Sequence, residues 1–330
     1  MSPEETRLQV GGQAVLEGVM MRSPQAMAIA VRLPNGSVLL KDEPFTSLTA
    51  RYPLLKRPFL RGPVILIEAL VTGVKALTFS AQAALEEEEE QLGWGSLFLT
   101  LGGAFLLAFL VFGFLPHWLS AMAGRLTGEP LTTAHFSFHV IDGLIKLLFI
   151  LLYIWGISFF QEIRRVFEYH GAEHKSICAY EAGEPLDIDH ARQHCTCHPR
   201  CGTTFILVVL LVSLVVFTIF FPLFPPLTRT GFLNNVVQVL VKVGLMLPIA
   251  ALAYEIIRWG GKHEDNVLAK ILLWPGLFTQ RLTTREPDDS QIEVALEALR
   301  AVLAREAGEE AEEPDVSVLT ASSSANSSIQ

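Results

Sequence analysis

The sequence contains no basic stripe with interleaved aromatic residues, the pattern that a nucleic-acid-binding surface shows. Nucleic acid is therefore not an expected partner. The formal charge of −9 does not change this, because residues 286–315 hold eleven acids and two bases and so account for all of it. The body of the chain is neutral, and only its C-terminal part is acidic.

Charged residues are nearly absent from four long apolar runs, at about residues 95–115, 143–160, 203–224 and 236–257. The chain of 330 residues is 51% hydrophobic, with a mean hydropathy of +0.40. A helix of about 20 apolar residues crosses a hydrocarbon core of about 30 Å. The expected fold class is therefore mainly α, a polytopic helical membrane protein with four transmembrane helices in the lipid bilayer.

Lysine and arginine are scarce in two of the loops between these runs. Only Arg125 lies between the first two runs and only Arg229 between the last two, against nine basic residues before the first run, five in residues 161–202 and seven after residue 257. Basic residues in short loops stay on the cytoplasmic side. Both termini and the 161–202 loop are thus expected in the cytoplasm. The N-terminal residues lack the basic segment and short apolar core of a signal peptide, so none is expected.

Residues 1–90 are expected to form a cytoplasmic α+β element with a β-hairpin and an interfacial helix. Asn35-Gly36 stands between two apolar runs, which is the strongest short-range hairpin signal. Residues 10–22 are glycine-rich, either to make turns or to let the backbone approach a ligand closely. Residues 62–85 form a helix with Pro63 in its first turn. A spanning helix here would separate residues 10–61 from the other basic segments, so an interfacial or re-entrant helix is expected.

The region after residue 90 is divided into three parts by the same patterns. Residues 91–258 are the transmembrane region, residues 259–305 a cytoplasmic helical segment, and residues 306–330 a disordered acidic and Ser-rich tail. Asp288 or Ser290 can cap a final helix. Its apolar positions form one stripe that is expected to pack on the N-terminal region, namely Ile292, Ala295, Leu296, Leu299 and Leu303. The acidic run 86–90 is expected to be a solvated linker.

Only four cysteines occur, and all of them lie in residues 169–204 together with five of the nine histidines. Cytoplasmic thiols stay reduced, so these cysteines are expected to be free or metal-bound rather than disulfide-linked. The stretch lies between the second and third apolar runs. Its composition predicts a metal site at the membrane surface.

Within this stretch, His170, Glu173 and His174 form an H-x-x-E-H motif. The residues after the second run are good helix formers, and residues four apart on a helix share a face. Gly171 is expected to bend that helix. Two imidazoles so placed can bind one Zn²⁺, and Glu173 can then act as general base towards water, as in the inverted form of H-E-x-x-H. A motif of five residues is by itself a weak signal.

A second set of ligand-type side chains, His194, His198 and Cys201, comes directly before the third apolar run. A catalytic zinc site needs a third protein ligand and keeps one position open. Cys201 is the preferred candidate, because the spacing of Cys195 and Cys197 matches no standard four-cysteine site. A thiolate with imidazoles favours Zn²⁺ or Fe²⁺ over Mg²⁺ or Ca²⁺.

These residues leave several functions open. The stretch could bind no metal, hold a structural metal closed by four protein ligands, or hold a catalytic or transport-linked metal. The leading hypothesis is a membrane-embedded metal-dependent hydrolase with Glu173 as its catalytic residue, and a peptidase is one version of it. The alternative is a zinc-stabilised membrane scaffold or a small-solute transporter, and the lack of an internal repeat weakens the transporter version.

Two charged residues within the apolar runs are further candidates, because charge inside a membrane is costly and often functional. Glu255 could supply a carboxylate to the metal or to one of its histidines, or could pair with Arg258. Lys242 is expected to snorkel towards the membrane surface.

Longer sequence words carry a family resemblance. They are residues 11–22 (GGQAVLEGVMMR), 169–175 (YHGAEHK), 198–203 (HPRCGT), Tyr254-Glu255 and 280–284 (QRLTT). In these words the chain resembles the YqhQ-like family of uncharacterised bacterial membrane proteins, which are described as predicted metal-dependent enzymes. With this resemblance, the expected location is the bacterial inner membrane. The resemblance covers most of the chain and implies a site made of His170, Glu173, His174, His194, His198 and Cys201. Cys195, Cys197 and His190 depart from the family pattern and are not carried into that site.

Overall fold

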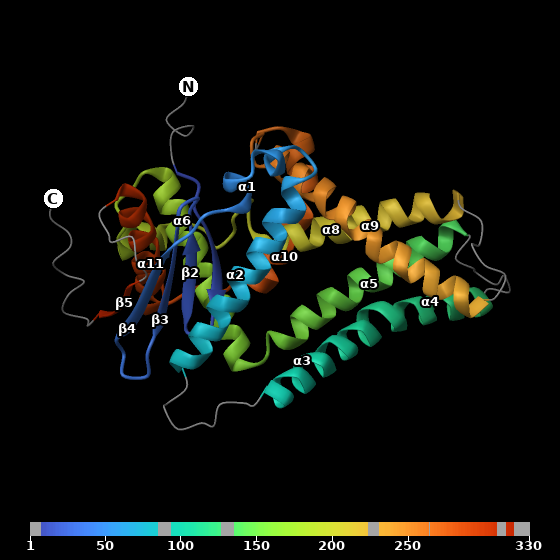
Figure 1. The fold of residues 1–330 in the computed structure, drawn as a ribbon, viewed down its shortest axis with the longest axis horizontal. Coiled ribbons are helices and arrows are strands. Elements are labelled where there is room, and N and C mark those ends of the chain that lie inside the picture. The colour runs from blue at the N-terminus through green and yellow to red at the C-terminus, as the bar shows by residue number, and fades with distance from the viewer. Residues whose placement is uncertain are drawn as a thin grey trace. The chain divides into compact units, whose positions relative to one another are not determined.

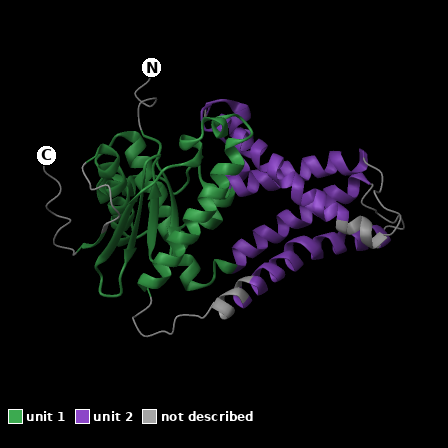
Figure 2. Ribbon diagram, viewed as in Figure 1, with its two compact units in different colours: residues 1–88, 157–203, 277–330 green, residues 89–156, 204–276 purple. Residues whose placement is uncertain are grey.

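The computed structural model describes residues 8–84, 94–126, 135–223, 231–263, 265–308 and 315–319. The chain divides into two compact units, of which the first contains residues 1–88, 157–203 and 277–330 and the second residues 89–156 and 204–276 (Figure 2). The N-terminal region, the His/Cys loop and the C-terminal segment therefore fold together, although the sequence divides them into separate regions. The acidic run 86–90 and most of the tail after residue 308 lie outside the described residues.

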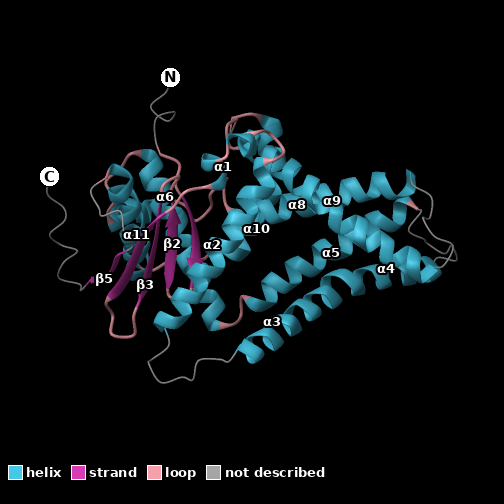
Figure 3. Cartoon of the chain, viewed as in Figure 1, coloured by secondary structure: helices cyan, strands magenta, loops and turns pink. Residues whose placement is uncertain are grey.

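The first unit is built on a five-stranded antiparallel sheet in the order β1-β2-β3-β4-β5 (Figures 1 and 3). The strands are β1 (Gly11–Val15), β2 (Gly18–Arg22), β3 (Ala26–Arg32), β4 (Val38–Pro44) and β5 (Asp315–Leu319). The β3–β4 hairpin turns at Asn35-Gly36, where Gly36 has a φ of 86°, so the predicted hairpin is confirmed. The structure adds the β1–β2 hairpin, and it places a strand in the tail that was expected to be disordered.

Two helices, α6 (Gln161–Ala182) and α11 (Asp289–Ala307), cover one face of the sheet. Side chains alternate between the two faces of a strand, so Val19 and Met21 of β2 pack with these helices. Met20 points to the other face, which α2 (Arg61–Ala84) covers through Ala76. Strands β2 and β3 are thus buried on both faces between helices of the same unit.

The cap and the apolar stripe predicted for the last helix are confirmed in α11. Asp288 accepts a hydrogen bond from the Gln291 backbone N–H at 2.9 Å, and the Gln291 side chain accepts one from the Asp288 N–H, which makes a capping box. Ile292, Leu296 and Leu299 are fully buried against the sheet. This capped stripe holds the C-terminal helix on the N-terminal strands.

The helix α2 has its small and polar side chains turned inward and its large apolar side chains turned outward. Its buried positions include Glu68, Thr72, Ala76 and Ser80, which recur every four residues. The outer face exposes Ile67, Leu70, Val71, Val74 and Leu77 to between 40% and 63%. An apolar outer face is what an interfacial helix needs, and that role stays a prediction.

The second unit is helical in its described residues. It contains α3 (Trp94–Ala108), a π-helical turn (Phe109–Phe114), α4 (Leu115–Leu126), α5 (Phe136–Ile157), α8 (Gly202–Leu223), α9 (Gly231–Gly260) and most of α10 (Val267–Thr283).

Within the described residues, five helices are long and apolar enough to cross a membrane by length and composition, where the sequence predicted four spans. Four of them, Gly102–Arg125, Phe136–Ile157, Gly202–Leu223 and Val237–Gly260, overlap the predicted runs. The fifth is α2.

Candidate metal centre

Helix α6 carries His170, Glu173 and His174 through the middle of the first unit, where every residue from Tyr169 to Ile177 is buried. The helix continues through Gly171. A Cβ atom at Gly171 would lie 2.1 Å from the carbonyl oxygen of Arg285, whose own N–H donates to the Phe167 carbonyl at 2.8 Å. Glycine is therefore needed here because another backbone segment passes close to the helix. The predicted bend at Gly171 is wrong, since α6 continues through this residue.

Two buried side chains hold the loop before Cys201 against α6. Lys175 donates from its Nζ to the carbonyl oxygens of Arg192 at 2.8 Å and His194 at 2.7 Å. Gln280, from the end of α10, accepts from the His198 N–H at 2.8 Å and donates to the His198 carbonyl at 2.7 Å. The loop is thereby fixed at two points, one on each side of Thr196, and both points precede Cys201.

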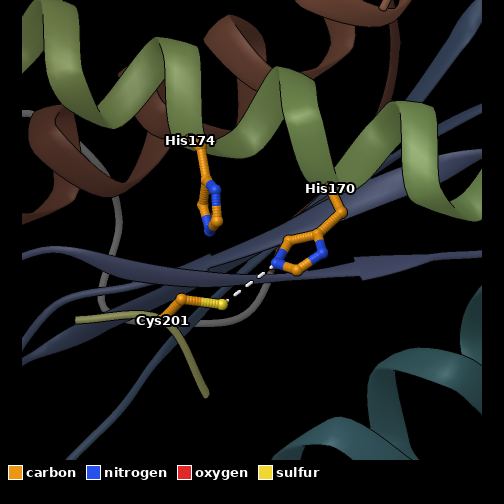
Figure 4. A group of neighbouring side chains, drawn as sticks. All are labelled: His170, His174 and Cys201. Carbon is orange, nitrogen blue, oxygen red and sulfur yellow. Dashed lines mark hydrogen bonds between the residues drawn. The ribbon is translucent and has the colours of Figure 1, made fainter. Parts of the chain in front are cut away.

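The structure brings His170, His174 and Cys201 together (Figure 4). One ligand atom from each of these three buried residues lies within 4.8 Å of the others. Nε2 of His170 is 3.2 Å from Sγ of Cys201, and the two imidazole rings are 4.4 Å apart between centroids. The H-x-x-E-H motif and the second set of ligand-type residues therefore meet, through one member of the second set.

Both imidazoles are oriented by backbone carbonyl groups. Nδ1 of His170 lies 2.8 Å from the Thr283 carbonyl oxygen, and Nδ1 of His174 lies 2.6 Å from that of Thr196. A carbonyl oxygen only accepts, so Nδ1 carries a proton in each ring, and in the neutral form of the ring Nε2 keeps a lone pair. Metal-binding histidines are held in this way by a second partner. Nε2 of His174 is buried without a hydrogen-bond partner among the described residues.

Burial also favours the neutral form of His174. It lowers the pKa of this imidazole, and the neighbouring Cys201 sulfur opposes only part of that effect. A neutral imidazole is the form that binds a metal ion. The donor set of two imidazoles and one thiol fits a Zn²⁺ ion.

Glu173 lies beside this group and is not one of its three members. Its side chain is 7% exposed, and its Oε2 is 4.0 Å from Nε2 of His170. Burial raises the pKa of Glu173, while His170, His198 and a hydrogen bond from the Gly12 N–H oppose the shift. A buried carboxyl group with a raised pKa next to possible metal ligands has the properties of a general base.

The other predicted ligands have different partners. Nε2 of His194 lies 2.7 Å from a carboxylate oxygen of Glu184, and Nε2 of His198 lies 3.2 Å from one of Glu181. The His198 ring is still near, with its centroid 5.7 Å from that of His174. Cys178, Cys195 and Cys197 are free thiols outside the three-residue group.

Sequence reasoning considered a close backbone approach in residues 10–22, but it assigned no place in the site to the residues that surround it. A Cβ atom on Gly12 would lie 2.8 Å from the carboxyl carbon of Glu173, so the glycine of β1 makes room for the carboxylate. Lys175 belongs to the family word 169–175, but nothing in the sequence indicated that it is buried, because a lysine beside a helix motif is usually exposed. The carbonyl groups of Thr196 and Thr283 are backbone atoms, which residue identity does not reveal.

Comparison with known sequences shows to which family the chain belongs. The profile of the family described as "Protein of unknown function (DUF1385)" matches residues 57–305. The chain belongs to this family. The DUF1385 match includes α6 and Cys201 and begins after strand β4. The chain is also 33% identical over 329 residues to "Uncharacterized protein YqhQ" of Bacillus subtilis (strain 168), covering 97% of this chain and 100% of that relative. No solved structure matches this chain. The family resemblance predicted from the sequence words is confirmed.

Proposed function

We propose that this protein is a membrane-embedded hydrolase that uses a zinc ion held by His170, His174 and Cys201. The observation that carries the proposal is the buried Nε2 of His174, which has no hydrogen-bond partner among the described residues while its ring faces a thiol and a second imidazole. An unsatisfied buried nitrogen is costly. A metal ion at this position would satisfy it.

The donor set supports zinc more than other metals. Two imidazoles and a thiolate are ligands that Zn²⁺ prefers, with Fe²⁺ as the second candidate. Three protein ligands are the number found in catalytic zinc sites, which leaves one position for water or substrate. A zinc ion bound there would supply Lewis acidity to water and to a substrate carbonyl group.

Glu173 is the residue we assign to proton transfer. Its carboxyl group lies next to His170 but outside the ligand group, and the Gly12 N–H holds it in place. A carboxyl group with a raised pKa can accept a proton from water and pass it to a leaving group. Peptide bonds are one candidate substrate. The distribution of basic residues supports a site at the cytoplasmic boundary of the inner membrane.

The second candidate is a zinc-stabilised membrane scaffold, and the burial of the site favours it. His174 is 1% exposed, His170 9% and Cys201 8%. Structural zinc sites are closed to solvent and contribute directly to folding. The two candidates differ in what Glu173 does, because a scaffold needs no base.

Metal analysis of the purified full-length chain tests the proposal. Zinc is measured by mass spectrometry in the wild type, His174→Ala, Glu173→Gln and the matched control His194→Ala. We expect about one zinc per chain in the wild type, Glu173→Gln and His194→Ala. We expect the zinc to be lost in His174→Ala, because this variant removes one of the three protein ligands. Absence of metal from the wild type, under conditions in which a reference zinc protein keeps its own, would end the proposal.

Glu173→Gln separates the two candidates once zinc is present. In a hydrolase it lowers cleavage of a fluorogenic peptide library by about 10²- to 10⁴-fold at unchanged zinc content. In a scaffold it leaves every property close to wild type, and His170→Ala lowers the melting temperature of the whole protein.

A further inference from the structure

The second unit contains three charged side chains that meet between two of its apolar helices. Asp142 lies on α5, its Oδ2 is 2.6 Å from Nζ of Lys146 one helical turn later, and it is 3.8 Å from Nζ of Lys242 on α9. The Asp142 side chain is 4% exposed, whereas those of Lys146 and Lys242 are 22% and 17% exposed. The carboxylate is therefore buried beneath two ammonium groups that remain reachable.

Lys242 points into the helix bundle, which differs from the expected snorkelling. Its ammonium group lies 5.6 Å from the ring centroid of Phe217 and 5.5 Å from that of Phe221, both on α8. Aromatic faces at this distance attract a cation. Together with Asp142 they hold the lysine inside the unit.

The charges of this group do not balance. Two ammonium groups and one carboxylate leave one positive charge, on helices that are long and apolar enough to cross a membrane. A single lysine would be enough for an ion pair with Asp142. The rings of Phe217 and Phe221 attract the second cation but carry no negative charge that would neutralise it. Unpaired charge in such surroundings marks a functional site.

The hydrogen bonds do not balance either. Each ammonium group has three donors, and the distance from Lys242 to Asp142 is too long for a hydrogen bond. The second carboxylate oxygen, Oδ1 of Asp142, is buried and lacks a partner in the described part of the chain. The group thus offers spare donors, one spare acceptor and one unit of positive charge.

We propose that Lys146, Lys242 and Asp142 bind a singly charged oxyanion that also carries a hydroxyl group. Its negative charge matches the surplus cation, its oxygens accept from the ammonium groups, and its hydroxyl group donates to Oδ1 of Asp142. Lysine is a common phosphate-binding residue. Dihydrogen phosphate and the hydroxyl-bearing phosphodiester headgroup of phosphatidylglycerol both have this chemistry, whereas chloride has no donor.

The test uses the full chain in nanodiscs of phosphatidylcholine at pH 6, where singly charged phosphate predominates. The melting temperature is followed while phosphate is added, and chloride at equal ionic strength is the reference. We expect a saturable rise with phosphate alone. The apparent affinity falls at least tenfold in Lys242→Met, and it is kept in Lys242→Arg and in the control Lys262→Met, which changes an exposed lysine.

A second arm identifies the source of the oxyanion. Nanodiscs that contain phosphatidylglycerol are analysed by native mass spectrometry, and a retained lipid that Lys242→Met loses would assign the site to the headgroup. If Lys242→Met does not fold, Lys146→Met is expected to give the same loss. The proposal is overturned if neither phosphate nor phosphatidylglycerol binds the wild type, or if the folded methionine variant binds them as tightly.

Discussion

The carboxylate of Glu173 occupies the space into which a side chain on Gly12 would project. A Cβ atom built on Gly12 lies 2.7 Å from Cγ and 2.8 Å from Oε1 of Glu173. At this point the backbone of strand β1 is in direct contact with the Glu173 carboxyl group of helix α6, with no room for a side chain between them. The glycine-rich N-terminal segment and the H-x-x-E-H motif are parts of one site.

Gly12→Ala is expected to destabilise the protein by displacing Glu173. Overpacking of this kind costs about 1–3 kcal/mol, and we expect the free energy of unfolding in denaturant to fall by that amount. Gly11→Ala is the matched control, because nothing lies within 4 Å of a Cβ atom there. In a Glu173→Ala background the cost of Gly12→Ala should largely vanish, since the two side chains compete for one space. An equal cost in both backgrounds would contradict the contact.

Gly171→Ala should be more damaging, because the new methyl group meets backbone. Its Cβ atom would lie 2.1 Å from the Arg285 carbonyl oxygen, which cannot rotate away as a side chain can. We expect a loss of about 3 kcal/mol in unfolding free energy and a lower zinc content. Gly202→Ala, with nothing within 4 Å, is the control. Wild-type stability in Gly171→Ala would mean that the segment after α10 does not cross α6 at this residue.

Lys175→Met is expected to loosen the loop that reaches Cys201. The Lys175 side chain is 3% exposed and also pairs with Glu286 at 2.7 Å, in addition to the two carbonyl groups it donates to. Hydrogen bonds from a charged donor are worth about 1.5–3 kcal/mol, so the unfolding free energy should fall by about 2–3 kcal/mol. Zinc should dissociate faster, as measured with a chromogenic chelator. Unchanged dissociation, with Lys262→Met as reference, would show that the loop does not depend on this lysine.

The cysteines should differ strongly in alkylation rate. Burial raises the pKa of the Cys178 thiol to about 12, with a smaller contribution from Cys195, whereas Cys195 itself is exposed. The thiolate is the reactive form, and at pH 8.5 less than about one Cys178 in a thousand carries it. Because the pKa is raised, the Cys178 rate should increase about tenfold per pH unit up to about pH 11. Peptide mass spectrometry after iodoacetamide treatment measures both rates, and similar rates in the folded protein would contradict the raised pKa of Cys178.

Local patterns in the sequence predicted those elements whose signals are contained in a few neighbouring residues. Asn35-Gly36 marks the β3–β4 turn because glycine accepts a positive φ, and the stripe on α11 follows from one face packing on the sheet. The β1–β2 turn escaped prediction because Glu17 takes a φ of 51° without being glycine or asparagine. A bidentate ion pair with Arg165, distant in sequence, accompanies this conformation.

In the candidate site, too, the sequence predicted what local spacing determines and did not predict what depends on contacts between distant residues. The spacing of His170 and His174 on one helix face is visible in the sequence, and so is the choice of Cys201 among the later candidates. The positions of His194 and His198 depend on where Glu184 and Glu181 lie in space, which spacing does not report. The fit between Gly12 and Glu173 depends on the packing of a strand on a helix about 160 residues later in the chain. In the sequence, the glycine signals only that some close approach is possible.

The discontinuity of the first unit has a consequence for how the protein is made. The Thr283 carbonyl orients His170, and α11 covers one face of the sheet. Both are synthesised after the helices of residues 94–126, 136–157, 202–223 and 231–260. A nascent chain therefore holds all three candidate ligands long before it can position them. If the site binds metal as proposed, loading would wait until translation has passed the last apolar helix, and a chain truncated before that point could not assemble the site.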